Sequence, residues 1–519
     1  MKVPLTPIRF LYRARDQFGS KRAIIEDEDS WTYSQFSDRC HRLASLLLSW
    51  GISTGARVAF LSYNSHALLE AYFGVLLAEA VLLPLNVRLT ANDFRLILND
   101  AEADVLFLDP DFLPSIEEIR GDLRTVHRFV QLDPGHQRDW IEPHAYDELI
   151  QQQSPAPDKD VRPIDEDSTA ELFYTSGTSG QPKGVMLTHR NLYLHALEVA
   201  LMLGIRDDDV QLHTIPLFHV NGWGTPQFLT CVGGCHVLMR KFEPQTTFRL
   251  IEKHRVTLFC AVPTMALSLL NHAGKRDYDL SSMRLVNLGG ASSTPDLVRR
   301  LEETFSCQCV AGYGLTETSP IVTLAFPKAH LGERGEKLLQ TKAMTGYPIP
   351  GIELEILDHA EQPLPWDGTT AGELVVRGDT VMKGYWREKQ DDLAPSDGWF
   401  RTGDLATINP HGYVRIVDRK KDVIISGGEN ISSLELEKTL LDHPAVLECA
   451  VIGVPNSRWG EVPKAFVVLR SQQATSQKEL LAHCRQQLAR FKVPRSIALV
   501  ESLPKGGTGK VIKRKLREG

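Results

Sequence analysis

The stretch YTSGTSGQPKGV, from Tyr174 to Val185, combines three glycines, five hydroxyl side chains, a proline and a lysine in twelve residues. Glycines let the backbone approach an anion closely, and successive backbone N–H groups can then surround a phosphate. The hydroxyl groups and Lys183 add donors and positive charge. The spacing is not that of a P-loop, because Pro182 stands five positions after Gly177. The stretch predicts a phosphate-binding loop, with a flexible surface loop as the alternative.

The composition is that of an ordinary globular protein, with 519 residues, 42% apolar and 24% charged. A net charge of -7 argues against a general nucleic-acid binder, so we expect no nucleic-acid partner. The eight cysteines lack zinc-type spacing, which favours reduced thiols inside a cell, with the cytoplasm as the expected location. The most apolar segment, 66–86, is interrupted by Glu70, Glu79 and Pro84, and therefore predicts a core helix and strand.

Strand-like and helix-like patterns alternate along the first third of the chain. Apolar runs at 57–65, 81–86 and 104–109 flank helical spacing, and Thr90 offers a hydroxyl N-cap. This order predicts an α/β fold with parallel-rich sheets covered by helices. From about Ile352 short strands with turns indicate a β-rich subdomain. A compact α+β portion with two helices, two strands and a basic tail follows Asp418.

Four later motifs accompany the glycine-rich stretch, namely GYGLTETSP (312–320), WFRTGDLA (399–406), VDRKKDVIISGGENISSLELE (417–437) and LPKGGTGKVIKRKLRE (503–518). Their sequences, order and separations resemble those of the adenylate-forming superfamily, which contains acyl-CoA synthetases, peptide synthetase adenylation domains and firefly luciferase. The resemblance covers nearly the whole chain and is nearest to medium- and long-chain fatty acyl-CoA synthetases. It implies a large domain, residues 1–417, that binds AMP and the acyl group, and a small mobile domain, residues 418–519.

The resemblance assigns roles in binding ATP and Mg²⁺. It places Tyr313 beside the adenine, Thr316 near the α-phosphate, and Glu317 on Mg²⁺ with help from Thr175. Asp404 and Arg419 hold the ribose, and Lys421 is a further nucleotide contact; without the resemblance Asp404 would be a turn residue. The remaining nucleotide-binding positions that it implies are Ser176, Gly177, Thr178, Ser179, Gly180, Lys183, Gly289, Gly290, Ala291, Gly312 and Gly314.

The small domain is expected to supply catalysis and the second substrate. A lysine at position 510 would stabilise the charge that develops on the phosphoryl oxygens as pyrophosphate departs, although a solvated basic tail is the ordinary meaning of such a run. By resemblance Asp418 is the hinge about which the domain turns after adenylation. Gly427 and Gly428 would then let the pantetheine arm of coenzyme A pass close to the backbone.

The stretch PLFHVNGWGTPQF, 216–228, is expected to bind the acid. His219 and Trp223 taken alone would more often be core packing. The resemblance places His219 at the acyl carboxylate, where it counts among the catalytic residues with Lys510 and Glu317. Val220 and Trp223 contact the substrate, and Trp223 is the gate of an acyl tunnel.

The resulting hypothesis is an AMP-forming acyl-CoA synthetase that uses ATP, Mg²⁺ and coenzyme A to activate a medium- or long-chain fatty acid. The alternatives are a fatty acyl-AMP ligase that loads a carrier protein, a ligase for an aryl or short branched acid, a luciferase-type monooxygenase, and a catalytically silent nucleotide-binding protein. A monomer or a homodimer and peripheral contact with a membrane are left open by the sequence.

Overall fold

The computed structural model describes residues 3–135, 138–157, 164–176, 182–388, 398–427, 429–470, 475–505 and 511–518. The chain forms two compact units. The first comprises Met1–Glu353 and Arg377–Phe400, and the second comprises Leu354–Val376 and Arg401–Gly519. The predicted hinge at Asp418 lies inside the second unit, so this division does not test a turn about that residue, and the domain boundary stays a prediction.

The first unit contains a seven-stranded sheet of order β18-β8-β7-β4-β3-β5-β6. Its strands β3 (Arg57–Leu61), β4 (Val81–Pro84), β5 (Ala103–Leu108) and β6 (Arg128–Gln131) run parallel to their neighbours. The side chain of Thr90 accepts the N–H of Asp93, so the predicted N-cap of α4 is confirmed. The helices along this part of the chain are α1 (Ile8–Phe18), α2 (Tyr33–Ser49), α3 (His66–Leu77), α4 (Ala91–Asp100), α5 (Leu113–Ile119) and α6 (Tyr146–Gln151).

An antiparallel hairpin completes this sheet and carries the glycine-rich stretch. Strands β7 (Thr169–Ser176) and β8 (Pro182–Thr188) form the hairpin, and the two-residue strand β18 (Gly384–Tyr385) pairs with β8. Parallel strands need long crossovers, whereas an antiparallel pair can be joined by a short loop. The hairpin therefore holds the two ends of the glycine-rich stretch next to each other.

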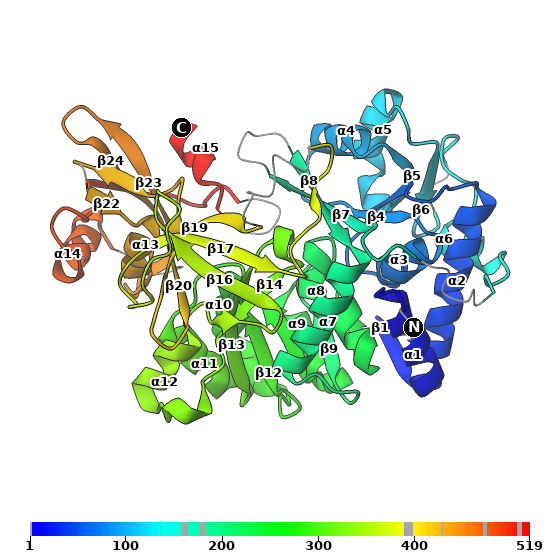
Figure 1. The fold of residues 1–519 in the computed structure, drawn as a ribbon, viewed down its shortest axis with the longest axis horizontal. Coiled ribbons are helices and arrows are strands. Elements are labelled where there is room, and N and C mark those ends of the chain that lie inside the picture. Colours follow the sequence, from blue (N-terminus) through cyan, green and yellow to red (C-terminus); the bar gives the residue numbers. More distant parts are fainter. Residues whose placement is uncertain are drawn as a thin grey trace. The chain divides into compact units, whose positions relative to one another are not determined.

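The first unit also contains a nine-stranded sheet of order β15-β14-β13-β12-β11-β9-β10-β1-β2. Leu212, Phe259 and Val286 on one face pack into an apolar core with Phe248 and Leu301. Helices α7 (His189–Leu203) and α8 (Val220–Val232) lie side by side, and Thr225 of α8 hydrogen-bonds His213 on the opposite face (Figure 1). The strands are β1 (Arg22–Glu26), β2 (Asp29–Thr32), β9 (Val210–His213), β10 (Cys235–Leu238), β11 (Leu258–Ala261), β12 (Leu285–Leu288), β13 (Gln308–Gly314), β14 (Ile321–Leu324) and β15 (Tyr347–Pro348), and the later helices are α9 (Pro244–His254), α10 (Pro263–Asn271), α11 (Pro295–Phe305) and α12 (Gly335–Lys342).

The second unit begins with the predicted β-rich portion, a four-stranded sheet of order β16-β17-β19-β20. A second sheet follows, in which β23 and β24 pair antiparallel and helices α13 and α14 pack on an apolar core that includes Ile424, Leu436 and Leu480. The elements are β16 (Ile352–Leu357), β17 (Gly372–Gly378), β19 (Phe400–Ile408), β20 (Val414–Arg419), β21 (Ile424–Ser426), β22 (Glu429–Ile431), β23 (Val446–Asn456), β24 (Gly460–Leu469), β25 (Ser496–Leu499), α13 (Ser433–Leu441), α14 (Gln477–Gln487) and α15 (Lys513–Glu518).

One local expectation was wrong. Asp404 was expected in a turn, but it lies inside β19 opposite Arg419, because the strand continues through Gly403 with a φ of +70°. Asp418, the expected hinge residue, is buried in β20. The end of the basic tail forms helix α15, which is held by ion pairs from Lys513 to Glu437 and from Arg517 to Asp422.

Among the described residues, no helix combines the length and the apolar character needed to cross a bilayer.

Candidate active site

The two strands that flank the predicted phosphate loop bring a hydroxyl and a cation together. In the hairpin Thr175 stands opposite Lys183, and the backbone of Ser176 stands opposite Pro182. Gly184 follows at a crowded point, where a Cβ would lie 3.0 Å from both Leu172 Cδ1 and Trp386 Cβ. Four predicted residues, Gly177, Thr178, Ser179 and Gly180, lie outside the described residues.

Lys183 is linked to the predicted metal-binding carboxylate through a tyrosine. Its ammonium lies 4.9 Å from the ring centroid of Tyr385 and 2.7 Å from Oε1 of Glu388. The Tyr385 hydroxyl donates a hydrogen bond of 3.0 Å to Oε1 of Glu317. Burial, with a further contribution from Glu317, raises the pKa of Tyr385, so the hydroxyl keeps its proton and donates. The sequence analysis missed Tyr385 and Glu388, and their only signal was a pair of aromatic residues in the stretch MKGYWRE.

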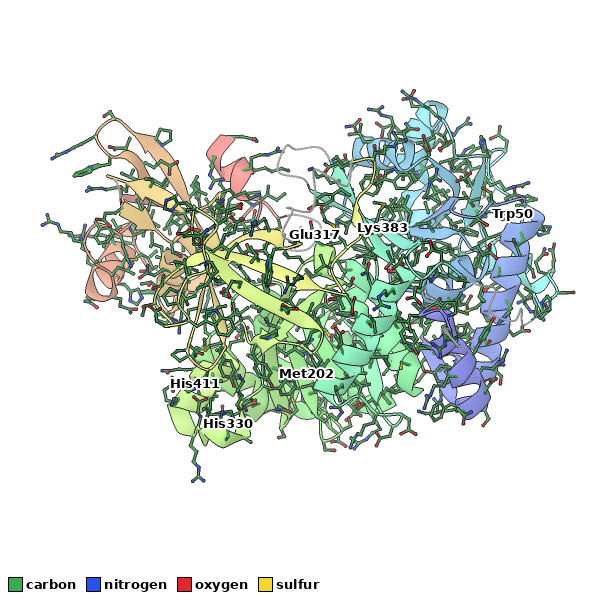
Figure 2. The ribbon with its side chains drawn as sticks, in the orientation of Figure 1. Trp50, Met202, Glu317, His330, Lys383 and His411 are labelled. Atoms are coloured by element: carbon green, nitrogen blue, oxygen red, sulfur yellow. The ribbon has the colours of Figure 1, made fainter. Side chains whose placement is uncertain are left out.

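Glu317 belongs to a short 3-10 turn, Thr316–Thr318, directly after β13. Its backbone carbonyl accepts the N–H of Met382, and Figure 2 labels Glu317 and Lys383, the residue that follows Met382. The preceding Gly314 admits no side chain, because a Cβ would lie 1.6 Å from the carbonyl oxygen of Pro320. Among the described residues no group of three or more His, Cys, Asp or Glu side chains could hold a metal ion. A single carboxylate fits Mg²⁺ that is held mainly by phosphate oxygens and water.

The predicted glycine-rich turn and the predicted acyl gate meet. A Cβ on Gly289 would lie 3.0 Å from Cη2 of Trp223, so the indole lies against the backbone of that turn. Trp223 packs with Ile215 and Cys260 in a small apolar cluster. Its φ of +75° is rare for a bulky residue, and Val220 at the start of α8 also has a positive φ. Gly290 and Ala291 are the exposed end of the same turn.

Two buried side chains that the sequence analysis missed fix the segment before His219. The side chain of Asn64 donates to the carbonyl of His213 at 2.9 Å and accepts the N–H of Leu217 at 2.7 Å. The hydroxyl of Tyr72 donates to the carbonyl of Leu217 at 2.6 Å. His219 follows as the half-buried N-cap residue of α8. No local sequence signal could have identified these contacts, because their partners lie about 150 residues away in the chain.

The sequence analysis also missed His195 of α7, which contacts both α8 and the start of β14. Its Nε2 accepts the N–H of Ile321 at 3.1 Å, and its Cε1 lies 2.8 Å from where a Cβ of Gly224 would stand. Burial lowers the pKa of His195 to about 3, so the ring is neutral and one nitrogen is free of a proton to accept that hydrogen bond. Gly312 and Tyr313 lie on β13, which pairs with the strand that begins at Ile321.

The second unit brings the two predicted ribose contacts together. Asp404, only 2% exposed, and Arg419 are opposite each other on β19 and β20, and the Arg419 Nε lies 2.6 Å from Oδ1 of Asp404. Lys421 is exposed just after β20. A carboxylate can accept several hydrogen bonds at once, which suits paired hydroxyl groups.

Two of the remaining predicted residues of this unit, Asp418 and Gly427, lie in the described part of the chain. Asp418 accepts the backbone N–H of Ser433 at 2.5 Å and its hydroxyl at 3.0 Å, and therefore anchors the first turn of that helix. Gly427 has a φ of +62° and lies against the indole of Trp459, whose Cε3 would be 2.7 Å from an added Cβ. Gly428 and Lys510 lie outside the described residues.

Comparisons with known proteins agree with this arrangement of motifs. The family model described as AMP-binding enzyme matches residues 11–386, and the model of the AMP-binding enzyme C-terminal domain matches residues 435–510. A long-chain-fatty-acid–CoA ligase of Thermus thermophilus is 38% identical over 98% of this chain and 94% of its own length. A 3-methylmercaptopropionyl-CoA ligase of Ruegeria pomeroyi is 38% identical over 95% of this chain and 92% of its own.

A solved structure shares the fold over the full length. The anthranilate CoA ligase AuaEII, crystallised with anthranoyl-AMP, is 28% identical, with a TM-score of 0.89, and the match covers 100% of this chain and 98% of that one. The chain belongs to the AMP-binding enzymes of the adenylate-forming superfamily, and its class is that of the ATP-dependent, AMP-forming acyl-CoA ligases.

Proposed function

We propose that this protein is a fatty acid–CoA ligase, which joins a medium- or long-chain fatty acid to AMP with release of pyrophosphate and then transfers the acyl group to the thiol of coenzyme A. The observation that carries the proposal is the contact of Trp223 with Gly289. It places an indole, in apolar surroundings, against the turn assigned to the space between adenine and acid. Burial of a hydrocarbon chain there would contribute about 0.8 kcal/mol per methylene.

The phosphate end of the site would be formed in the first unit. The described residues that would contact the triphosphate are Thr175, Lys183 and Thr316, with the loop Gly177–Gly180 between the strands of the hairpin. Glu317 would hold Mg²⁺, which when bound neutralises phosphate charge. Tyr385 would keep Oε1 of Glu317 in one place and leave Oε2 for the metal.

The second unit would contribute the ribose contacts, the catalytic cation and the path of coenzyme A. Asp404 and Arg419 would bind the ribose hydroxyl groups. Lys510 would stabilise the charge on the α-phosphoryl oxygens while the carboxylate attacks. A rotation of the small domain about Asp418 would then withdraw Lys510 and bring Gly427 and Gly428 to the pantetheine arm.

The acid would enter with its carboxylate near His219 and its chain near Trp223. No acidic side chain stands at position 219, so the site offers no partner for an α-ammonium group there. The cytoplasmic location, the choice between monomer and homodimer, and contact with a membrane surface stay predictions.

The test is pyrophosphate release over a panel of straight-chain acids from butyrate to stearate, with benzoate and cinnamate, each with and without coenzyme A. A fatty acid–CoA ligase should release pyrophosphate fastest with a medium or long chain and form the thioester. Pyrophosphate release without thioester would indicate transfer to a carrier protein, and a preference for benzoate, cinnamate or butyrate would replace the fatty acid by that class.

A further inference from the structure

One face of the nine-stranded sheet carries a row of buried polar side chains under α8. Cys260 of β11 and Asn287 of β12 are register partners, and Gln211 of β9 is opposite Leu258, two residues before Cys260. Alternate residues of a strand share a face, so Gln211, Cys260 and Asn287 lie on the same side of the sheet. Gln211 is 1% exposed and Asn287 is 3% exposed.

The end of this row nearest β10 is fully paired. His213 Nε2 and His236 Nδ1 are 3.0 Å apart, and the outer nitrogens of the two rings reach hydroxyl groups of α8, Thr225 at 3.2 Å and Thr230 at 3.1 Å. Each ring nitrogen therefore has a partner. At this end of the row, the hydroxyl groups of α8 provide hydrogen-bond partners for the buried histidine nitrogens.

The other end of the row is left half paired. The Gln211 amide donates to the carbonyl of Leu212 at 3.3 Å, and the Asn287 amide lies 3.9 Å from Sγ of Cys260. Within the part of the chain that the structure describes, neither Oε1 of Gln211 nor Oδ1 of Asn287 has a hydrogen-bond partner. A buried acceptor without a donor is destabilising, and such groups are uncommon in folded proteins.

The two acceptors border the residues assigned to the acid. Cys260 packs with Trp223 and Ile215, and Asn287 lies two residues before Gly289, which contacts the Trp223 indole. Oδ1 of Asn287 lies 3.8 Å from where a Cβ of Gly312 would stand, so this oxygen is directed toward the nucleotide motif. Asn287 thus lies next to Gly289 and Gly312, and the side chain of Gln211 reaches Cys260, which packs on Trp223.

We propose that Asn287 and Gln211 are specificity-determining residues and that the preferred acid carries a hydrogen-bond donor, a hydroxyl or amino group, on its acyl part. This inference rests on the proposed acyl-CoA ligase function and narrows the class of acid. A donor on the acid would hydrogen-bond to Oδ1 of Asn287 or Oε1 of Gln211, whereas a plain hydrocarbon chain would leave both acceptors without a hydrogen bond. Sites built to hydrogen-bond a substrate group discriminate strongly against the analogue that lacks it.

The first experiment compares matched acids with the unaltered protein. The pairs are hexanoate with its ω-hydroxy derivative, benzoate with its ortho-amino derivative, and cinnamate with its para-hydroxy derivative, each followed by pyrophosphate release. We expect kcat/KM to be higher by about tenfold or more for the donor-bearing acid in at least one pair. Equal or lower kcat/KM for the donor-bearing acid in all three pairs would overturn the inference. Failure of every acid to release pyrophosphate would instead contradict the ligase function itself.

The second experiment uses Asn287→Leu and Gln211→Leu. Each substitution removes the unpaired oxygen at similar volume, so the ratio of kcat/KM for the donor-bearing acid to kcat/KM for the plain acid should fall toward unity. Gln131→Leu is the matched control, because Gln131 is also a buried glutamine with an unpaired Oε1 but lies on β6 of the other sheet. The Gln131→Leu variant should show the same ratio of kcat/KM values within each pair of acids as the unaltered protein.

A buried water molecule is the competing explanation for the two oxygens. In that case both leucine variants would change thermal stability but leave the ratio of kcat/KM values within each pair unchanged, and the inference would be wrong. Should one leucine variant fail to fold, the other one and the ratio measured with the unaltered protein still decide the outcome.

Discussion

The expected phosphate site and the expected ribose site each contain a cationic side chain, and the two cations have different carboxylate partners. In the first unit Lys183 is paired with Glu388, a half-buried acid with no assigned role in binding ATP. In the second unit Arg419 is paired with Asp404, a buried acid that is itself an expected ribose contact. A triphosphate would therefore have to replace a carboxylate at Lys183, whereas a ribose would join an ion pair that is already in place.

The comparison extends to the third expected cation, Lys510, and there the largest effect is predicted. Lys510→Ala should reduce acyl adenylate formation on the order of a thousandfold, because one preorganised charge at the developing oxyanion is lost. Thioester formation from supplied acyl adenylate should stay near its original rate. Rapid-quench assays of the two half-reactions measure this, and an equal loss of both would contradict the division of labour.

Asp404→Asn tests the ribose side. The substitution preserves the shape but removes the charge that holds Arg419, and we expect ATP to bind about tenfold to a hundredfold more weakly. Isothermal titration with ATP and with a 2′,3′-dideoxy analogue is the measurement. The analogue should bind the variant and the unaltered protein with similar affinity. A variant that loses affinity equally for both nucleotides would show that Asp404 supports the fold and does not contact the ribose.

Tyr385→Phe tests how the phosphate side is ordered. Without the hydroxyl, Glu317 can rotate, so the Mg²⁺ concentration for half-maximal pyrophosphate release should rise about threefold to tenfold. Binding of Mn²⁺ in the presence of ATP, followed by electron paramagnetic resonance, should weaken in parallel. Tyr278→Phe is the control, because Tyr278 stacks on Phe248 in the apolar core. An unchanged metal requirement in Tyr385→Phe would remove Tyr385 from the site.

The sequence predicted the strands, helix ends and motifs that depend on residues close together in the chain. The alternating pattern predicted the parallel strands β3, β4 and β5, and hydroxyl chemistry predicted the N-cap at Thr90. The Gly-Asp pair at 403–404 was misread as a turn, because a glycine with positive φ inside a strand looks the same in one dimension as a glycine in a turn.

The missed site residues depend on contacts between distant segments. Tyr385 reaches Glu317 because a two-residue strand pairs with β8, and so short a strand has no periodic pattern. Asn64 reaches Leu217, in the stretch expected to bind the acid, across 153 residues of sequence. Asn287 appears in the sequence as an ordinary polar residue before two glycines, and only its burial next to Cys260 gives it a candidate role.

Glu388→Gln gives the smallest expected effect and the sharpest test of the contrast between the two cations. The amide keeps the size of the side chain but cannot hold Lys183 as an ion pair, so ATP would no longer compete with a carboxylate. The pair is about one-third exposed on each side, and water screens such pairs, so ATP should bind only about twofold to threefold more tightly. The gain should shrink as salt is raised, because salt weakens the same ion pair in the unaltered protein. Weaker ATP binding in Glu388→Gln would mean that the acid orders Lys183 for the phosphate and does not compete with it, and the two cations would then be held ready in the same way.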